Sequence, residues 1–349
     1  YLLNDAVDPV YIKPNRISKD EFLKLMGTAE MEYRVPVAVT ARMGYRDETP
    51  VIRAEVMNHG ADTMPMRLSF RSSISEIAGG TVDVTARPRE ATPVLFPLKF
   101  EKPWTTAELS FKAEAGSKHY ELAPVTIRFR PLAAASSGKT PVIDGVVNAG
   151  EWDGHAGITL DSLPALRNAV PAVWGGRNDM SGRVWLAWDS VSLYLGFKVL
   201  DDKRGERNNR LGVWNSDCIE LFLDTAPDDQ PTASGFNANA CQIVIGMPTV
   251  QFPEIVMLKA SGMLEVNTAN MPVKTSTQPG GYDVELAIPW KELGGLKPEA
   301  GTQIGFDVCL SDDDATSRKL SLVWSGDADY YKNRLNFGRV MLSSRERSR

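Results

Sequence analysis

Histidine and cysteine are scarce in this chain of 349 residues, which contains three of each. No cysteine belongs to a Cys-x-x-Cys motif, and all three lie in predicted strands among apolar neighbours, which favours buried thiols over disulfides or metal ligands. The histidines are scattered and have no nucleophile signature beside them. Carboxylates are too abundant for spacing alone to single out a catalytic pair. The sequence therefore predicts no catalytic site. The six residues are Cys218, Cys241, Cys309, His59, His119 and His155.

Long apolar runs and blocks of basic residues are also missing. No run approaches the ~20 apolar residues of a transmembrane helix, so we expect no membrane span. The net charge of −5, without a Lys/Arg stripe, argues against nucleic acid and anionic membrane surfaces as partners. The chain starts with Tyr1 and shows no signal peptide, which indicates a processed chain or a piece of a longer protein. A catalytic domain upstream of Tyr1 is compatible with this sequence.

Length and composition predict two all-β domains. A chain of 349 residues, 43% apolar and 24% charged, is long enough to bury two separate cores. The small, polar stretch PLAAASSGKT is typical of a linker and marks the boundary. A capping-box pattern at Ser18 predicts one short helix near the start. The predicted parts are an N-terminal extension with this helix (1–32), a first β-sandwich (33–131), the linker (132–140), a second β-sandwich (141–343) and a tail (344–349).

Residues 33–131 have an immunoglobulin-like pattern. About seven short alternating segments recur with turn signals every ~8–12 residues, which is typical of a sandwich of two antiparallel sheets. Two of those turns are Asn58-His59-Gly60 and Gly79-Gly80. No functional constellation stands out here, so we expect a spacer or docking domain, by analogy alone.

The stretch 183–224 carries the clearest pattern of the second domain. Two alternating runs flank Asp189-Ser190 and predict a hairpin of half-buried strands. In a third strand, at 216–224, Glu220 and Phe222 share one face and aliphatic residues the other. A polar loop before it ends in the isolated Trp214. An aromatic ring beside a carboxylate suits a sugar, because the ring stacks on the pyranose and the carboxylate accepts hydrogen bonds from hydroxyls. Spacing alone favours the alternative, a core tryptophan at a loop-strand junction beside a solvated glutamate.

Short strands without helical stretches continue through 141–343 and predict an antiparallel sandwich or jelly-roll. In order and spacing, this part resembles the family 9 carbohydrate-binding modules and their wider relatives. The resemblance implies a jelly-roll β-sandwich that binds carbohydrate without catalysis, as an accessory region of a larger secreted protein of polysaccharide degradation, extracellular or periplasmic. The matching pieces are Pro141 to Gly145, Glu151-Trp152, Trp188-Asp189, Leu193-Tyr194, Val199 to Asp201, Trp214, Asp217, Ile219-Glu220, Asp224, Tyr282 to Glu285, Ile288 to Trp290, Gly301, Ile304-Gly305, Asp312 to Asp314, Trp324 and Phe337-Gly338.

The resemblance also implies a ligand site. Modules of this family hold a terminal sugar between two aromatic side chains, and Trp214 matches the first of them. Tyr331 matches the second by its spacing from a later Phe-Gly pair, with Tyr330 as the neighbouring candidate. Glu220 matches a sugar-contacting acid, and Gln242 lies on the neighbouring predicted strand. Tyrosine replaces the family's second tryptophan, so we expect a smaller clamp that still stacks and donates a hydrogen bond.

One departure from the family weakens this expectation. The family's sugar binders carry an arginine near the position of Val244. Losing a charge-assisted donor from a buried polar site costs ~1.5–3 kcal/mol, which is up to roughly a hundredfold in affinity. Arg334 and Arg210 are candidates to replace it. If neither does, the alternative is a structural interaction module whose sugar site has decayed.

Structural calcium is a further expectation from the resemblance. Oxygen-rich loops supply three candidate groups, none with the spacing of an EF-hand. Solvated acidic loops are the alternative interpretation. The groups are Asp201-Asp202, Asp224 with Asp228-Asp229, and Asp312 to Asp314.

A haem-binding electron-transfer domain is the alternative from another class. Related sandwiches bind haem through a methionine and a histidine or lysine. Methionine in a β-core is more often a packing residue, and the chain lacks a Cys-x-x-Cys-His attachment motif. The candidate ligands are Met247, Met257, Met263, Met271, His155 and Lys259.

Overall fold

The computed structural model describes residues 36–46, 49–75, 77–98, 105–152, 154–155, 157–205, 212–228, 234–250, 253–314, 318–326 and 328–344. These residues form mainly strands, which confirms the predicted all-β class. The chain divides into two compact units, one ending at Phe129 and one beginning at Arg130. The N-terminal extension with its predicted helix, and the tail from Arg345, lie outside the described residues. Within the described part, no helix combines the length and apolar character that crossing a membrane requires.

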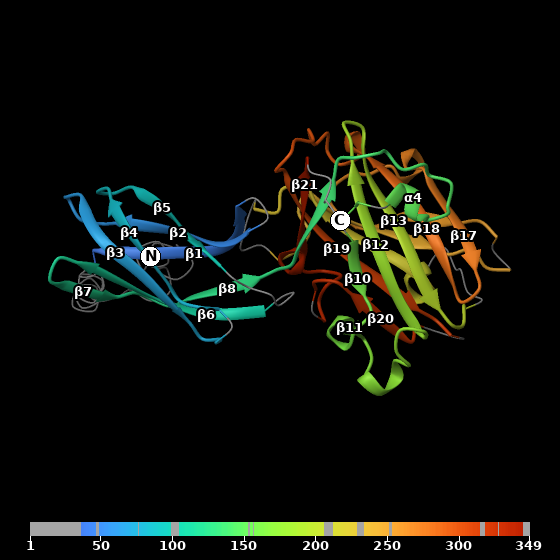
Figure 1. The fold of residues 1–349 in the computed structure, drawn as a ribbon, viewed down its shortest axis with the longest axis horizontal. Coiled ribbons are helices and arrows are strands. Elements are labelled where there is room, and N and C mark those ends of the chain that lie inside the picture. Colours follow the sequence, from blue (N-terminus) through green and yellow to red (C-terminus); the bar gives the residue numbers. More distant parts are fainter. Residues whose placement is uncertain are drawn as a thin grey trace, which may run out of the picture. The chain divides into compact units, whose positions relative to one another are not determined.

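The first unit contains two antiparallel sheets (Figure 1). One has the order β1-β2-β5, and the other has the order β4-β3-β6-β7 with β8 also paired to β6. Side chains from both sheets share one apolar core around Phe70, Phe96 and Phe111. This is consistent with a β-sandwich, while the immunoglobulin-like assignment stays a prediction. The strands are β1 (Val37–Arg46), β2 (Thr49–Asn58), β3 (Met64–Ser72), β4 (Gly80–Ala86), β5 (Ala91–Pro97), β6 (Thr105–Ala115), β7 (Lys118–Glu121) and β8 (Val125–Phe129).

The second unit is a long curled sheet whose halves pack face to face. Its order is β16-β15-β14-β19-β21-β9-β12-β13-β18-β17, with β10 beside β12 and β20 between β11 and β19. Inward-facing side chains of both halves, such as Phe197, Leu221 and Phe306, form one apolar core. The strands are β9 (Leu132–Ser136), β10 (Gly157–Leu160), β11 (Leu166–Arg167), β12 (Met180–Trp188), β13 (Ser192–Asp201), β14 (Cys218–Asp224), β15 (Ala240–Gly246), β16 (Val256–Gly262), β17 (Val273–Gln278), β18 (Gly281–Pro289), β19 (Gln303–Asp312), β20 (Leu320–Val323) and β21 (Gly338–Ser343).

Helical structure in the described residues is limited to single turns. Their composition explains this, because proline, glycine and asparagine recur at or beside them and favour turns over long helices. These turns are α4 (Ala149–Trp152) and the 3₁₀ turns η1 (Leu163–Ala165), η2 (Pro171–Val173), η3 (Val213–Asn215), η4 (Thr268–Asn270), η5 (Trp290–Glu292) and η6 (Arg334–Asn336).

The predicted hairpin and the predicted faces of the third strand are confirmed, but the hairpin strands are buried on both faces over most of their length instead of half-buried. Strands β12 and β13 pair antiparallel, and Asp189 Oδ1 accepts the backbone N–H groups of Val191 and Ser192 in the connecting turn. Such side-chain acceptors favour tight turns. In β14 the aliphatic face, including Leu221, lies in the main core, whereas Phe222 belongs to a different apolar cluster on the other face. Period-two alternation therefore assigned both faces of β14.

The predicted linker 132–140 requires a correction, because Leu132–Ser136 forms β9. This strand pairs in parallel with β21 along its whole length and meets β12 at Ser136, so it joins the two halves of the curled sheet. Ala135 is fully buried in the core. Alanine and serine have weak strand propensity, so composition suggested a flexible segment. Pairing with β21, which lies about two hundred residues later in the sequence, overrides that propensity.

Ala135→Glu should destabilise the second unit by about 3 kcal/mol or more, because it places an unpaired carboxylate in the core. Lys139→Glu, in the same predicted linker but exposed, is the matched control and should leave the unfolding midpoint unchanged. The free energy of unfolding of both variants is measured by urea titration, with tryptophan fluorescence as the signal. Equal tolerance of the two substitutions would contradict a structural role for β9.

Candidate functional site

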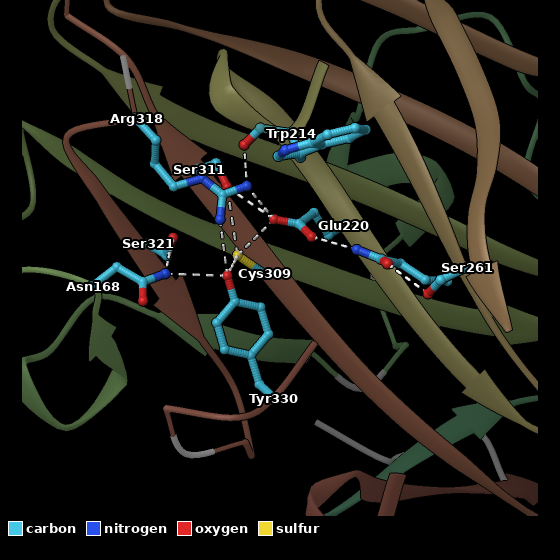
Figure 2. A network of polar contacts seen from close by, with 10 residues as sticks. Asn168, Trp214, Glu220, Ser261, Cys309, Ser311, Arg318, Ser321 and Tyr330 are labelled. Carbon is cyan, nitrogen blue, oxygen red and sulfur yellow. Dashed lines mark hydrogen bonds and ion pairs between the residues drawn. The ribbon is translucent and has the colours of Figure 1, made fainter. Parts of the chain in front are cut away.

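Glu220 projects from the outer face of β14 and is 2% exposed. A carboxylate buried this deeply needs charged or hydrogen-bonding partners. Arg318 lies on one side of Glu220 (Figure 2), with its Nη2 2.6 Å from Oε1. Gln242 Nε2 donates to Oε2 at 2.6 Å. Ser311 Oγ donates to Oε1 at 3.3 Å. The carboxylate is therefore paired and held in one position.

Gln242 extends this network toward the edge of the sheet. It lies on β15, opposite Phe222 of β14, so it is a diagonal neighbour of Glu220 on the same face. Its Oε1 accepts a hydrogen bond from Ser261 Oγ of β16 at 2.8 Å. The predicted proximity of Gln242 and Glu220 is thus observed, with the amide oriented by one partner on each side.

Arg318 connects three parts of the site (Figure 2). It belongs to the loop between β19 and β20, and its Nη2 donates to Glu220 and to the backbone carbonyl of Trp214. Its Nη1 donates to Tyr330 Oη at 3.0 Å. Burial opposes the charged form of Arg318, but the negative charge of Glu220 outweighs it and raises the pKa of the guanidinium above its usual value. One partly buried cation therefore holds the carboxylate and two loops together.

Arg318 supplies a guanidinium beside Glu220 although position 244, where the family has an arginine, is a valine. Val244 lies directly opposite Glu220 in the register of β14 and β15, so an arginine there would stand beside the carboxylate. In this chain Val244 is fully buried among apolar side chains. Arg318 brings a guanidinium to the same carboxylate from another loop. A guanidinium therefore lies beside Glu220 although position 244 is a valine.

Of the two arginines proposed from the sequence, only Arg334 lies in the described residues. Arg334 pairs with Asp224 at 2.6 Å, with both side chains buried, and Arg210 lies outside the described residues. Sequence reasoning missed Arg318 because it stands in a polar loop with no distinguishing pattern. Its partner Glu220 lies on β14, and only the pairing of β14 with β19 brings the loop near.

The aromatic candidates divide into exposed and buried side chains. Trp214, in η3, is 41% exposed, and Tyr331 is 46% exposed. Tyr330 is buried: its ring packs edge-on against Phe222, with centroids 5.6 Å apart. Burial raises the pKa of its hydroxyl, which stays protonated. Tyr331 lies edge-on to Tyr330, also at 5.6 Å. Trp214 and Tyr331 therefore offer rings to a ligand, while Tyr330 supports them from inside.

Hydrogen bonds thus join Trp214, Glu220, Gln242 and Tyr330 through Arg318, and Tyr331 adjoins this network through Tyr330. We call these residues and Arg318 the β14 site. The role of each of them as a sugar ligand stays a prediction.

A second polar feature is a cluster of carboxylates, Asp179, Asp312 and Asp314, whose ligand atoms lie within 4.8 Å of one another. Lys319 Nζ contacts all three, at 2.7 Å from Asp314 and 3.4 Å from Asp312. Asp312 is fully buried and neither of its oxygens has a hydrogen-bond partner. Burial raises the pKa of Asp312 to about 7, against the attraction of Lys319. The sequence had proposed 312–314 as a calcium group but missed Asp179.

Asp201, from another predicted calcium group, belongs to the same acidic region. It is 2% exposed, and its Oδ1 accepts the backbone N–H of Lys203. Burial raises its pKa, and the charge of Asp314 acts in the same direction. Asp201 therefore adds negative charge next to the cluster.

The third predicted calcium group is engaged with arginines instead. Asp224 holds Arg334, and Asp228 lies 3.6 Å from Arg339. Asp229 lies outside the described residues. Asp224 and Asp228 are thus already neutralised by cations of the chain.

The candidate haem ligands lie in the core, at the surface or in contact with other side chains. Met247 and Met271 pack in the main core, and Met263 is 62% exposed. His155 shares a hydrogen bond of 2.6 Å with Ser136 and packs edge-on against Trp152. The two core methionines therefore act as packing residues. The two remaining candidates are Met257, which packs against the core from the outside, and Lys259, which pairs with Glu265.

Together these features define a class: a β-sandwich with two exposed aromatic side chains, Trp214 and Tyr331, at a network around a buried, paired carboxylate. Residues 143–345, more than half of the chain, match the family described as carbohydrate family 9 binding domain-like, and the chain belongs to this family. The resemblance read from the sequence is thereby confirmed. The family is one of non-catalytic binding domains, in agreement with the predicted lack of a catalytic site.

The chain is 24% identical over 213 residues to endo-1,4-beta-xylanase A of Thermotoga neapolitana, in a match that covers 60% of this chain and 18% of the xylanase. It is 25% identical to exoglucanase XynX of Acetivibrio thermocellus, covering 59% of this chain and 17% of that protein. The chain thus spans less than a fifth of these relatives. A carbohydrate binding module family 9 from Caldicellulosiruptor kristjanssonii in complex with cellotriose is 22% identical, with a TM-score of 0.49, covering 62% of this chain and 95% of that one.

Removing Arg318 should be more damaging than removing the whole ion pair. Arg318→Met leaves the buried Glu220 without its cation and should cost about 3 kcal/mol. Adding Glu220→Gln should recover part of that loss, because the amide carries no charge to neutralise. Urea unfolding of both single variants and the double variant gives the coupling energy. Lys332→Met, at an exposed ion pair, is the control; additive losses at 220 and 318 would contradict the coupling.

Proposed function

We propose that this chain binds carbohydrate without altering it, as the accessory part of a larger carbohydrate-active protein. The observation that carries the proposal is the β14 site: two exposed aromatic rings, Trp214 and Tyr331, beside the buried network of Arg318, Glu220 and Gln242. In a chain of this family, such an arrangement offers both a stacking surface and oriented polar groups.

The two parts of the site have different tasks. The rings of Trp214 and Tyr331 stack on the apolar face of a pyranose and supply most of the affinity. Glu220 and Gln242, held by Arg318 and Ser261, orient the hydroxyl groups. Because these partners are already fixed in the free protein, little side-chain entropy is lost when a sugar binds.

The remainder of the protein is also part of the proposal. We infer that a catalytic domain belongs to the same polypeptide and that the protein acts outside the cytoplasm, extracellular or periplasmic. The support is that this chain matches only 18% of the length of a relative that is named as a xylanase, an enzyme that acts on a polysaccharide. Sequencing the gene upstream of the Tyr1 codon tests this, and an open reading frame without an export signal or a further domain would contradict it.

Calorimetric titration with glucose, cellotriose and xylotriose tests sugar binding. Trp214→Ala and Tyr331→Ala should each weaken binding by about tenfold or more, because each removes one stacking surface. Tyr331→Phe should keep most of the affinity if stacking dominates. The control is Val191→Ala, an exposed apolar residue in the β12–β13 turn.

Two results would count against the β14 site. Binding that survives Trp214→Ala unchanged would move the sugar to another surface. If the parent chain binds none of a broad panel of sugars, the result would favour a structural interaction module whose sugar site has decayed.

We also propose that Asp179, Asp312 and Asp314 hold a structural calcium ion. Carboxylate oxygens are the ligands that Ca²⁺ prefers, and the three lie within 4.8 Å of one another. A single ammonium, Lys319, faces all three, so negative charge remains in excess. The buried Asp312, whose oxygens lack hydrogen-bond partners, supports the proposal most directly. Bound calcium would tie the loop that follows β19 to the segment that precedes β12.

Thermal unfolding with excess CaCl₂ and then with EDTA tests the calcium proposal. At a hundredfold excess over Kd the ion should stabilise by about 2.7 kcal/mol, which raises the melting temperature of a unit of this size by about 5–10 °C. Asp312→Asn should abolish the difference between the two conditions, while Asp228→Asn should keep it. An Asp312→Asn variant that responds to calcium like the parent would place any metal site elsewhere.

A further inference from the structure

A cavity lies away from the residues of the β14 site, next to α4 and strands β12 and β13. Its volume is ≈ 240 Å³. Figure 1 shows α4 beside β13. A Cβ atom on Gly196 would lie 2.6 Å from Trp152, so the indole of Trp152 rests directly on β13. The residues that line the cavity are Val147, Asn148, Ala149, Trp152, Gly154, His155, Arg183, Trp185 and Lys198.

Trp185 and Arg183 form a stacked pair in the wall of this cavity. Both project from the same face of β12, and the guanidinium carbon of Arg183 lies 4.7 Å from the ring centroid of Trp185. Trp185 stands between Gly157 of β10 and Gly196 of β13 in the sheet register. The two glycines leave room on either side of the ring, which Arg183 and Trp152 occupy. The result is a half-buried indole with a cation held over it.

Lys198 adds a second cation to this face. It is exposed and lies directly opposite Arg183 in the β12–β13 pairing. Like charges at directly opposed positions destabilise a sheet, and the carboxylate that faces Lys198 in the register, Asp283 of β18, lies on the side of Lys198 away from Arg183. A ligand with a negative charge would remove the repulsion.

Two carboxylates of β18, Asp283 and Glu285, lie on the same face of the sheet, and both are engaged in hydrogen bonds. Asp283, opposite Lys198 on β18, accepts the backbone N–H of Val147 and the side-chain amide of Gln278. Glu285 accepts two backbone N–H groups from the loop before α4 and the indole N–H of Trp152 at 2.8 Å. Both carboxylates are buried, whereas Arg183 and Lys198 are exposed and line the cavity, so a ligand in the cavity meets the cations.

We propose that this cavity binds an acidic sugar residue, one that carries a carboxylate as hexuronates do. The sugar ring lies against Trp185, and the carboxylate bridges Arg183 and Lys198. A guanidinium binds a carboxylate through two parallel hydrogen bonds, and an aromatic wall gives the ring an apolar contact. The site uses other strands and other residues than the β14 site, so it is independent of neutral-sugar binding there.

Titration of the whole chain with glucuronate, glucose and acetate tests this second site. Glucuronate binding should weaken about tenfold or more in Arg183→Gln and in Lys198→Gln, and it should weaken with added salt. Trp214→Ala should leave glucuronate binding unchanged. The control is Lys297→Gln, at an exposed lysine outside the cavity, which should bind as the parent does. Glutamine keeps much of each side chain's length, and circular dichroism verifies that the variants fold.

Three results would overturn the proposal. Acetate binding as tightly as glucuronate would show that no sugar is recognised. Loss of glucuronate binding in Trp214→Ala, with retention in Arg183→Gln, would place the acidic sugar in the β14 site. Absence of any glucuronate binding to the parent chain, whether or not neutral sugars bind, would leave the cavity without this function.

Discussion

Burial of β14 on both faces is the constraint on which the β14 site depends. All seven residues of this strand are buried, the aliphatic ones in the main core and the others under loops on the outer face. One of the outer residues is the carboxylate Glu220, which water cannot solvate there. The protein must neutralise it internally, and Arg318 does so at 2.6 Å. The ion pair is thus a requirement of the fold before it is a feature of the site.

The same ion pair places the exposed aromatics. Arg318 also binds the carbonyl of Trp214 and the hydroxyl of Tyr330, so three loops of the outer face depend on one guanidinium. A buried ion pair contributes little net stability, since desolvation offsets most of the attraction. Its value here is positional: it fixes where Trp214 and Tyr331 meet the solvent. Rigid aromatic surfaces with oriented polar groups are what sugar recognition requires.

Other buried carboxylates of the second unit differ in how their charge is compensated. This difference distinguishes carboxylates with a structural role from candidate metal ligands. Asp307 accepts the backbone N–H groups of Ser325 and Gly326, so its partners are part of the local fold. Asp312 has neither hydrogen-bonding partners nor a cation of its own, because Lys319 is shared with two further carboxylates. A bound cation would compensate the excess negative charge of Asp179, Asp312 and Asp314.

The sequence by itself determined the all-β class, the β12–β13 hairpin and the two faces of β14, because alternation with period two is a local property. It also singled out Trp214 and Glu220, since an isolated tryptophan before a strand and a carboxylate on an aromatic face are visible in neighbouring residues. Only the tertiary structure decided that Leu132–Ser136 is a strand, that Arg318 pairs with Glu220, and that Arg183 and Lys198 face one cavity. Each of these depends on the register between strands distant in sequence or on how a loop folds back, and no local pattern encodes either.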